Sequence, residues 1–277
     1  MPSKNELWVF EVDLLLEAIF FRYGYDFRHY SRASLERRVE NRLALSDLSS
    51  PSEMITKVLH EPAFFELFLK DMSITVTDMF RDPHVFRVIR EVVFKQLRTY
   101  SRVNIWHAGC ATGEEVYSMA IMLHEEGLLK RTRIYATDYN NRSLEVAQQG
   151  IYPVEKMQEF TANYHEAGGK GSLADYYQAK YEYAKINDIF NASITFANHN
   201  LVKDQVFAQM NLIVCRNVLI YFDQHLQDQV LTLFANSLVH RGYLVLGDKE
   251  TLALSKVQDE FECVSYEQRI YRKLAKV

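Results

Sequence analysis

Residues 103–123 read VNIWHAGCATGEEVYSMAIML and contain the pattern that decides the fold. A short apolar run is followed by a loop of small residues that includes Gly109 and Gly113, and then by two carboxylates and apolar residues at helical spacing. This order predicts a strand, a glycine loop and a helix, which together open a nucleotide-type cofactor site. Glycines allow a ligand to approach the backbone closely, and the first turn of a helix offers unpaired N–H groups. Because any tight strand-to-helix turn favours glycine, the pattern is also typical of a turn without a ligand.

Glu114 and Glu115, in the first predicted helical turn, narrow the choice of ligand. Acidic side chains there suit the helix dipole, but they repel a phosphate. A ligand with an amino group and a positive charge is attracted instead. S-adenosylmethionine has an ammonium and a sulfonium, so the sequence favours this cofactor over a dinucleotide.

The composition of the whole chain limits the class of protein. The 277 residues are 48% hydrophobic with a net charge of −4, which suits a large core and a smaller second domain and argues against a general nucleic-acid binder. The three cysteines have no C-x-x-C spacing, so we expect neither disulfides nor a metal site. Acidic residues interrupt the apolar stretch at 7–21, so we expect no signal peptide, no membrane insertion and a cytoplasmic protein.

Residues 1–84 have helical patterns, and we predict that they form an all-α domain with a linker motif at its end. Arg38 and Arg42 are four residues apart and share one face of a predicted helix. This basic pair is either a solvated face that pairs with Glu36 and Glu40, or a docking face for an acidic helix, and the sequence favours neither. Residues 73–83 (SITVTDMFRDP) predict an ordered connection of the kind that covers a cleft.

Strands and helices alternate in the second predicted domain, at residues 85–277, except for an interruption at about 151–192. Tyrosines alternate with polar residues at 177–183, which predicts a half-exposed strand in a small antiparallel insertion. Its exposed edge either takes a partner peptide by strand addition or belongs to a hairpin without a partner. From residue 103 we count seven strands that end in an antiparallel pair, and this predicts an α/β fold.

Polar residues follow the ends of several predicted strands. They are Glu115, Asp138, Asn200, Arg216 and Asn217, with Tyr221 a short step beyond. In open parallel sheets the ligand lies across the carboxyl ends of the strands, so we expect these side chains to converge. Asp138 follows the glycine loop by about 20–25 residues, the position of an acid that accepts hydrogen bonds from ribose hydroxyls. The alternative for Asp138 is a cap on the following helix.

Several motifs resemble those of the CheR-type chemotaxis receptor glutamate methyltransferases. They are TVTDMFRD, WHAGCATGEEVYSMAI, IYATDYN…LEVAQQGIY, the pair Asn200-Leu201 and CRNVLIYFD. The resemblance covers nearly the whole chain and implies a Rossmann-like class I methyltransferase sheet, a small inserted β-subdomain and an all-α domain that meets the receptor. It also implies methyl transfer from S-adenosylmethionine to receptor glutamates, which yields methyl esters and S-adenosylhomocysteine. The implied partner is the cytoplasmic helical domain of the receptor, and we expect a monomer.

By position, the resemblance also implies roles for individual residues. Cofactor binding is assigned to Thr75, Thr77, Arg81, Glu115, Asp138, Asn200, Leu201, Arg216 and Asn217. Glu115 matches the carboxylate that takes the cofactor's amino group, and Asp138 matches the ribose acid. Arg81 and Tyr221 match the residues nearest the transferred methyl, and the resemblance therefore implies that they are catalytic. Arg38 and Arg42 are the implied receptor-docking pair.

The chain departs from the family pattern at two places. Thr75 stands where the family usually has Asn, and Gly-Asp-Lys-Glu at 247–250 stands where the family usually has Gly-His-Ser-Glu. Other classes of function also fit the residues: a dinucleotide oxidoreductase, a methyltransferase for another protein or a small molecule, and a non-catalytic module that senses the cofactor.

Overall fold

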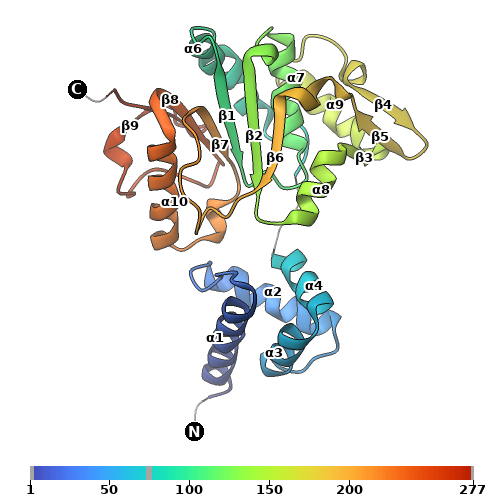
Figure 1. Cartoon of the computed structure of the whole chain (residues 1–277), viewed down its shortest axis with the longest axis vertical. Helices are drawn as coiled ribbons and strands as arrows, with labels where there is room; N and C mark the ends of the chain where they lie inside the picture. Colours follow the sequence, from blue (N-terminus) through green and yellow to red (C-terminus); the bar gives the residue numbers. More distant parts are fainter. Residues whose placement is uncertain (1–2, 73–76, 276–277) are drawn as a thin grey trace. The chain divides into compact units, whose positions relative to one another are not determined.

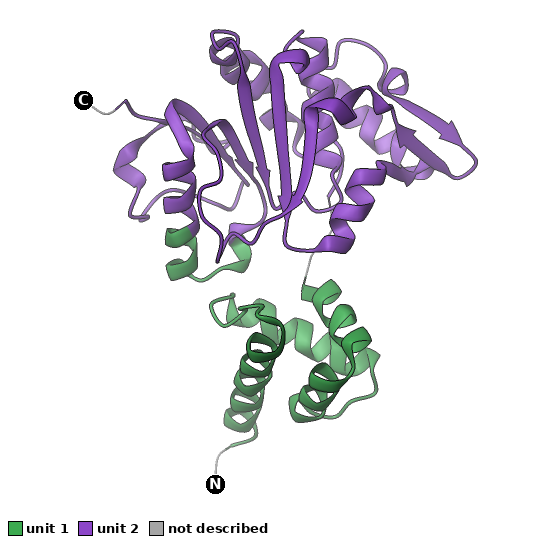
Figure 2. Ribbon diagram, in the orientation of Figure 1, with its two compact units in different colours: residues 1–74, 220–229 green, residues 75–219, 230–277 purple. Residues whose placement is uncertain are grey.

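The computed structural model describes residues 3–72 and 77–275 of the chain (Figure 1). The chain divides into two compact units: unit 1 comprises residues 1–74 and 220–229, and unit 2 comprises residues 75–219 and 230–277 (Figure 2). Unit 1 differs in two ways from the helical domain expected at 1–84. The linker residues 77–84 belong to unit 2, and a segment from the second half of the chain belongs to unit 1.

Helices from the amino-terminal part of the chain build most of unit 1. They are α1 (Lys4–Tyr23), α2 (Arg32–Leu45), α3 (Pro51–His60) and α4 (Pro62–Met72). A capping box starts α1: the Glu6 N–H donates to Ser3 Oγ at 3.3 Å, and the Ser3 N–H donates to the Glu6 carboxylate at 2.7 Å. Gly24 ends the helix with a left-handed φ of 75°. The ring of Tyr23, in the last turn of α1, stacks on the ring of Phe65 in α4 with the centroids 3.7 Å apart.

The segment at 220–229 is hydrogen-bonded to the loop before α2. Ser31 N–H donates to the Tyr221 carbonyl at 2.7 Å, and Asp223 N–H donates to the His29 carbonyl at 2.9 Å. Tyr30 and Phe222 form an antiparallel bridge, and their rings meet edge to face with centroids 5.0 Å apart. The end of the CRNVLIYFD motif therefore completes unit 1, which the sequence did not predict.

A seven-stranded sheet forms the centre of unit 2, in the order β6-β2-β1-β7-β8-β10-β9. Its strands are β1 (Val103–Ala108), β2 (Thr132–Asp138), β6 (Ile194–Asn198), β7 (Met210–Cys215), β8 (Leu238–Leu246), β9 (Phe261–Ser265) and β10 (Ile270–Lys273). The pairs from β6 through β8 are parallel, whereas β10 is antiparallel to both β8 and β9. This confirms the predicted α/β fold with an antiparallel last strand. Every residue of β7 is buried, as expected for a central parallel strand covered on both faces.

Helices precede β1 and lie between the later strands. They are α5 (Pro83–Val88), η1 (Ile89–Val93), α6 (Phe94–Leu97), α7 (Glu114–Glu125), α8 (Asn141–Gln149), α9 (Met157–Glu166) and α10 (Gln224–Ser237), with short 3₁₀ turns η2 (Leu129–Arg131), η3 (Val154–Lys156), η4 (Leu173–Tyr176), η5 (Asp188–Ser193), η6 (Leu219–Tyr221) and η7 (Gln258–Glu260). The segment before β1 consists of α5, the π-helical turn η1 and α6 in succession. No helix within residues 3–72 and 77–275 is long and apolar enough to cross a membrane.

The predicted insertion is a three-stranded antiparallel sheet with the order β3-β5-β4, which confirms the small β-subdomain. Its strands are β3 (Ile151–Pro153), β4 (Tyr177–Lys180) and β5 (Tyr183–Ile186). The single strand predicted at 177–183 is wrong, because the chain turns at Tyr181, whose φ is 56°, and β4 pairs with β5 as a hairpin. The strand β4 lies at an edge of this sheet. Strand addition by a partner peptide at such an edge stays a prediction.

Candidate active site

The glycine loop at 109–113 joins β1 to α7 as predicted, and close packing requires its glycines. Gly109 and Gly113 have φ values of 77° and 91°, in the left-handed region. A Cβ on Gly109 would lie 2.5 Å from Val218 Cγ2, and one on Gly113 would lie 2.8 Å from Ala147 Cβ. Gly109 N–H and the next N–H donate to the carbonyl of Thr137, at the end of β2, at 2.8 and 2.9 Å. The loop is therefore held against the neighbouring strand whether or not a ligand is bound.

Asp138 ends β2 and accepts hydrogen bonds from two backbone N–H groups. Ala111, in the glycine loop, donates to Oδ2 at 2.9 Å, and Asn140 donates to Oδ1 at 2.9 Å. Burial raises the pKa of Asp138, although these N–H groups act in the opposite direction. The alternative that Asp138 caps the next helix is wrong, because Asn140 is the N-cap of α8. Asp138 therefore connects the glycine loop to the end of the second strand.

Glu115 lies in the first turn of α7 and contacts two basic side chains. Its Oε1 lies 3.1 Å from Nδ1 of His107, and its Oε2 accepts a hydrogen bond from Arg216 at 2.9 Å. Burial on its own would raise the pKa of Glu115. The hydrogen bond with His107 and the charge of Arg216 outweigh that effect and hold the pKa below its usual range. Glu115 is therefore an anion at neutral pH.

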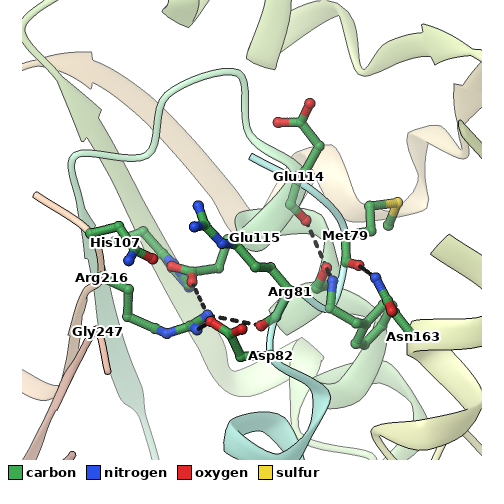
Figure 3. Close-up of polar contacts among 12 residues, drawn as sticks. Met79, Arg81, Asp82, His107, Glu114, Glu115, Asn163, Arg216 and Gly247 are labelled. Carbon is green, nitrogen blue, oxygen red and sulfur yellow. Dashed lines mark hydrogen bonds and ion pairs between the residues drawn. The ribbon is translucent and has the colours of Figure 1, made fainter. Parts of the chain in front are cut away.

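Arg216, directly after β7, joins α7 to the linker motif (Figure 3). Its Nη1 also donates to the Arg81 carbonyl at 3.1 Å, and its Nη2 contacts the Asp82 carboxylate. The side chain of Arg216 is 2% exposed, so it is a buried cation between the carboxylates of Glu115 and Asp82. Phe80 and Asp82 have positive φ values of 55° and 54°, a conformation that costs free energy in residues with side chains. The contact with Arg216 helps to hold this bent linker in place.

Two further hydrogen bonds hold the linker against α7 and α9. Phe80 N–H donates to Oγ of the buried Ser118, at 2.9 Å, and this hydroxyl donates to the Glu114 carbonyl at 2.7 Å. Asn163 of α9 donates to the Met79 carbonyl at 3.2 Å (Figure 3). Phe80 itself is fully buried. Residues 77–82 are thus an ordered part of the site, as the sequence predicted for the connection.

Glu114 differs from Glu115, although the two residues are adjacent. Its carboxylate is buried and accepts a hydrogen bond from Thr112 Oγ1 at 2.7 Å. Burial, with a smaller contribution from the charge of Asp78, raises the pKa of Glu114 to about 7. The first turn of α7 therefore carries one carboxylate that is fully ionised at neutral pH and one that is partly protonated.

Glu250 orients the loop after β7, and the sequence did not single it out. Its carboxylate accepts the N–H groups of Gly247 at 2.6 Å, Asn217 at 3.1 Å and Val218 at 2.8 Å. Asn217 has a φ of 59°, and a Cβ on Gly247 would lie 2.8 Å from the Asn217 nitrogen. The departure from the family pattern lies at Asp248 and Lys249, while the glutamate that makes these contacts is retained. The role of Glu250 is visible only in the tertiary structure, because the three N–H groups that its carboxylate accepts come from two separate loops.

Asn200 follows β6, on the far side of β2 from the glycine loop. Its side-chain oxygen accepts the Val202 N–H at 3.0 Å, and its own N–H donates to Asp204 at 2.7 Å. The preceding residue, His199, donates its N–H to the Asp138 carbonyl at 3.1 Å. This places Asn200 and the half-buried Leu201, which the resemblance assigns to cofactor binding, near the end of the second strand.

Unit 2 thus brings together most of the predicted cofactor residues. Those with contacts in the glycine loop, the linker and the adjacent strand ends are Arg81, Glu115, Asp138, Arg216 and Asn217, and Asn200 directly follows His199, which contacts the end of β2. Thr77 and Leu201 adjoin these contacts in the chain, and Thr75 lies outside the described residues. His107 and Glu250 join the site without having been predicted. In the described part of the chain, no cluster of three metal-ligating side chains was found.

Tyr221, Arg38 and Arg42 belong to unit 1. The guanidinium of Arg38 lies over the Tyr221 ring, 4.8 Å from its centroid, and also donates to the Met72 carbonyl. Arg42 pairs with Asp71. Both arginines are buried, so the alternative of a solvated face is wrong. Spacing on a helix tells which residues share a face, but it does not tell whether a neighbouring helix covers that face. Docking of a receptor by this pair stays a prediction.

The residues present fit a cofactor with an ammonium and an adenosyl group. An anionic Glu115 and the acid Asp138 lie on either side of a glycine loop with closely packed backbone. No lysine or arginine lies in residues 109–115 to neutralise a pyrophosphate. The chemistry of this set favours a cationic ligand over a dinucleotide.

Comparison with known proteins agrees with this geometry. A family model described as "CheR methyltransferase, SAM binding domain" matches residues 75–270, and one described as "CheR methyltransferase, all-alpha domain" matches residues 11–73. A protein of Pseudomonas putida with the provisional name methyltransferase Cher3 is 49% identical over 263 residues, which are 95% of this chain and 96% of that protein. "Chemotaxis protein methyltransferase 2" of Pseudomonas aeruginosa is 30% identical over 77% of this chain and 76% of its own length.

Proposed function

The chain belongs to the CheR methyltransferase family, and we propose that it methylates glutamate side chains of chemotaxis receptors with S-adenosylmethionine. The products are a glutamate methyl ester and S-adenosylhomocysteine. The observation that carries the proposal is the buried junction of Glu115, Arg216 and the linker at 81–82, which joins the predicted cofactor helix to the predicted catalytic arginine. Membership of this family contradicts the alternative of a dinucleotide oxidoreductase.

Each predicted cofactor contact follows from the chemistry of the residue. Glu115 receives the ammonium of the methionyl part, since its carboxylate is ionised and has lone pairs beyond those used by His107 and Arg216. Asp138 receives the ribose hydroxyls, and Asn200 with Leu201 borders the adenine. Asn217, held by Glu250, lies beside the end of β7. When bound, S-adenosylmethionine supplies an electrophilic methyl group.

The chain itself needs no general base for this reaction. A glutamate with a reference pKa of about 4.3 is already ionised at neutral pH. Positive and negative charges cancel as the methyl group moves to the carboxylate oxygen, so exclusion of water and alignment provide the rate enhancement. We assign alignment to Arg81, whose planar guanidinium can hold both oxygens of the receptor glutamate. A strong ion pair between Arg81 and the receptor glutamate would stabilise the charged reactant more than the transition state, in which that charge is partly lost.

The all-α domain is assigned to receptor recognition. Arg38 lies under Tyr221, and the family resemblance places Tyr221 near the reaction. We propose that the helical receptor domain docks on the helix that carries Arg38 and Arg42. We also propose that the protein works in the cytoplasm as a monomer, without metal or nucleic acid.

A methyl-transfer assay tests the proposal. The full chain is incubated with radiolabelled S-adenosylmethionine and a panel of receptor cytoplasmic fragments, and released methanol is measured after treatment with base. We expect base-labile label on the receptors, none on fragments whose methylated glutamates are replaced by glutamine, and loss of label with Asp138→Ala. The control Lys95→Ala, an exposed position outside the site, should retain activity.

Label on small molecules or on other proteins alone would favour the broader methyltransferase alternative. Binding of the cofactor without any transfer would favour the sensing module.

A further inference from the structure

A second concave region lies in unit 2, at the opposite end of the sheet from the site described above. Its lining includes Val103 and Thr132, the first residues of β1 and β2, and Ile189 of η5. In Figure 1 this is the end from which β1 and β2 begin. The depression has a volume of about 1030 Å³, enough for a ligand of nucleotide size, since ligand pockets are typically about 300–1,000 Å³. We call it the amino-end depression.

Cations line the amino-end depression on an otherwise acidic protein. Arg102, Lys130, Arg131 and Arg133 all belong to its lining, and the lining contains no aspartate or glutamate. None of these four makes an ion pair with another described residue. A concave surface lined by charges of one sign attracts and concentrates ligands of the opposite sign.

The acidic side chains nearest in the chain do not neutralise this surface. Glu126 pairs with Arg90, Arg98 and Lys170, and Asp188 pairs with Lys185. These cations are not among the lining residues. The positive charge of the depression is therefore left for a ligand or for water.

Arg131 provides an independent observation within the depression. Its Nη2 donates to the Arg98 carbonyl at 3.2 Å, which orients the guanidinium. The half-buried guanidinium of Arg131 is therefore held in one orientation in the lining, where its charge faces no carboxylate of the lining.

We propose that the amino-end depression binds a small polyphosphate anion, either free or as part of a nucleotide. Guanidinium groups bind phosphate oxygens in a two-pronged geometry, and three of the four lining cations are arginines. The half-buried ring of Tyr135 also lines the depression and would offer a stacking surface to a nucleobase. This inference does not depend on the proposed methyl transfer, because no residue is shared between the two sites.

Calorimetric titration of the full chain tests the proposal. The titrants are sodium tripolyphosphate, ATP and GTP, each at low and at physiological salt, with S-adenosylhomocysteine present to occupy the methyltransferase site. We expect saturable binding that weakens with salt. In Arg102→Glu/Arg133→Glu the affinity should fall at least about tenfold. Both side chains are exposed, so folding should persist, and the unfolding midpoint checks this. In Lys130→Ser the affinity for the titrants should fall by a smaller factor.

Lys95→Glu/Lys180→Glu is the matched control, because it changes net charge equally at exposed positions outside the lining. Its affinity for the titrants should stay within about twofold of the wild type. Tighter binding of ATP or GTP than of tripolyphosphate identifies a nucleotide, and equal binding identifies free polyphosphate. The proposal is wrong if no titrant binds, if the control loses as much affinity, or if poly-L-glutamate competes as well as polyphosphate does, which would indicate an acidic protein partner. Failure of S-adenosylhomocysteine to bind would count against the proposed function only.

Discussion

The charged side chains at the two ends of the unit 2 sheet differ in whether they are paired within the protein. At the carboxyl ends of the strands, Glu115 and Asp138 are held by hydrogen bonds, and the buried cation Arg216 lies between two carboxylates. At the amino ends, cations such as Arg102 and Arg133 are exposed and make no ion pair with other described residues. Charge at the first end organises the fold itself, whereas charge at the second end is available to an outside ligand. Substitutions at the two ends should therefore differ in their effects on stability.

Arg216→Met should have the largest effect. It leaves Glu115 and Asp82 without their shared cation, and loss of one partner from a buried ion pair costs about 4 kcal/mol. We expect a loss of that order in the free energy of unfolding in urea, together with loss of S-adenosylhomocysteine binding. Arg102→Met, at the exposed amino end, should change the unfolding free energy by less than about 0.5 kcal/mol. Similar losses in the two variants would contradict the comparison.

Arg81→Lys tests alignment without removing charge. Its backbone carbonyl still accepts the hydrogen bond from Arg216, so the linker and cofactor affinity should be preserved. We expect kcat for receptor methylation to fall about 100-fold, because a planar group that positions the carboxylate is replaced by a point charge. Arg133→Lys is the matched change at the other end and should leave kcat unaltered. Equal turnover of Arg81→Lys and the wild type would exclude the proposed role.

Glu114 should make stability depend on pH. Burial raises its pKa to about 7 in the folded protein, so between about pH 4.5 and 7 the folded state holds a proton that the unfolded chain has lost. The contribution of Glu114 to stability is therefore largest below pH 4.5 and declines as the pH rises to 7, by about 3 kcal/mol. Urea unfolding of Glu114→Gln should lack this decline.

Glu126 is the control, because its pKa is shifted in the opposite direction to that of Glu114. Burial would raise its pKa, but Lys170 and Arg90 outweigh that effect and lower the pKa. Its contribution to stability should therefore be present above about pH 4.5 and decline as the pH falls. If both variants changed the pH dependence of the unfolding free energy in the same direction, the assignment of these two environments would be wrong.

Glu250→Gln should have the smallest effect of the series. The amide keeps one acceptor oxygen, but its NH₂ group would face a backbone N–H of the loop after β7. We expect a loss of about 1 kcal/mol in unfolding free energy and a several-fold weaker binding of S-adenosylhomocysteine. Lys249→Gln, at the exposed neighbouring position, should match the wild type. No change in cofactor affinity would show that the loop does not need this carboxylate.

Several features could be predicted because they depend on neighbours in the chain. The strand, glycine loop and helix at 103–125 follow from local periodicity and turn residues, and the structure confirms them. It also confirms an antiparallel insertion, although the strand predicted at 177–183 is a hairpin. The site residues at strand ends could also be predicted, since parallel strands bring their carboxyl ends to one edge. Local patterns could not predict the partners of His107 and Glu250, because those contacts join residues on separate elements.

The amino-acid sequence alone determined the class of fold, the family resemblance and the position of a cofactor site at the carboxyl ends of the strands. Only the tertiary structure decided that residues 220–229 complete unit 1, that Arg38 and Arg42 are buried, and that the cations around Arg131 gather in one depression. The physical reason is distance along the chain. Periodicity and turn chemistry act over a few residues, whereas burial and the pairing of charges depend on segments that folding brings together from far apart.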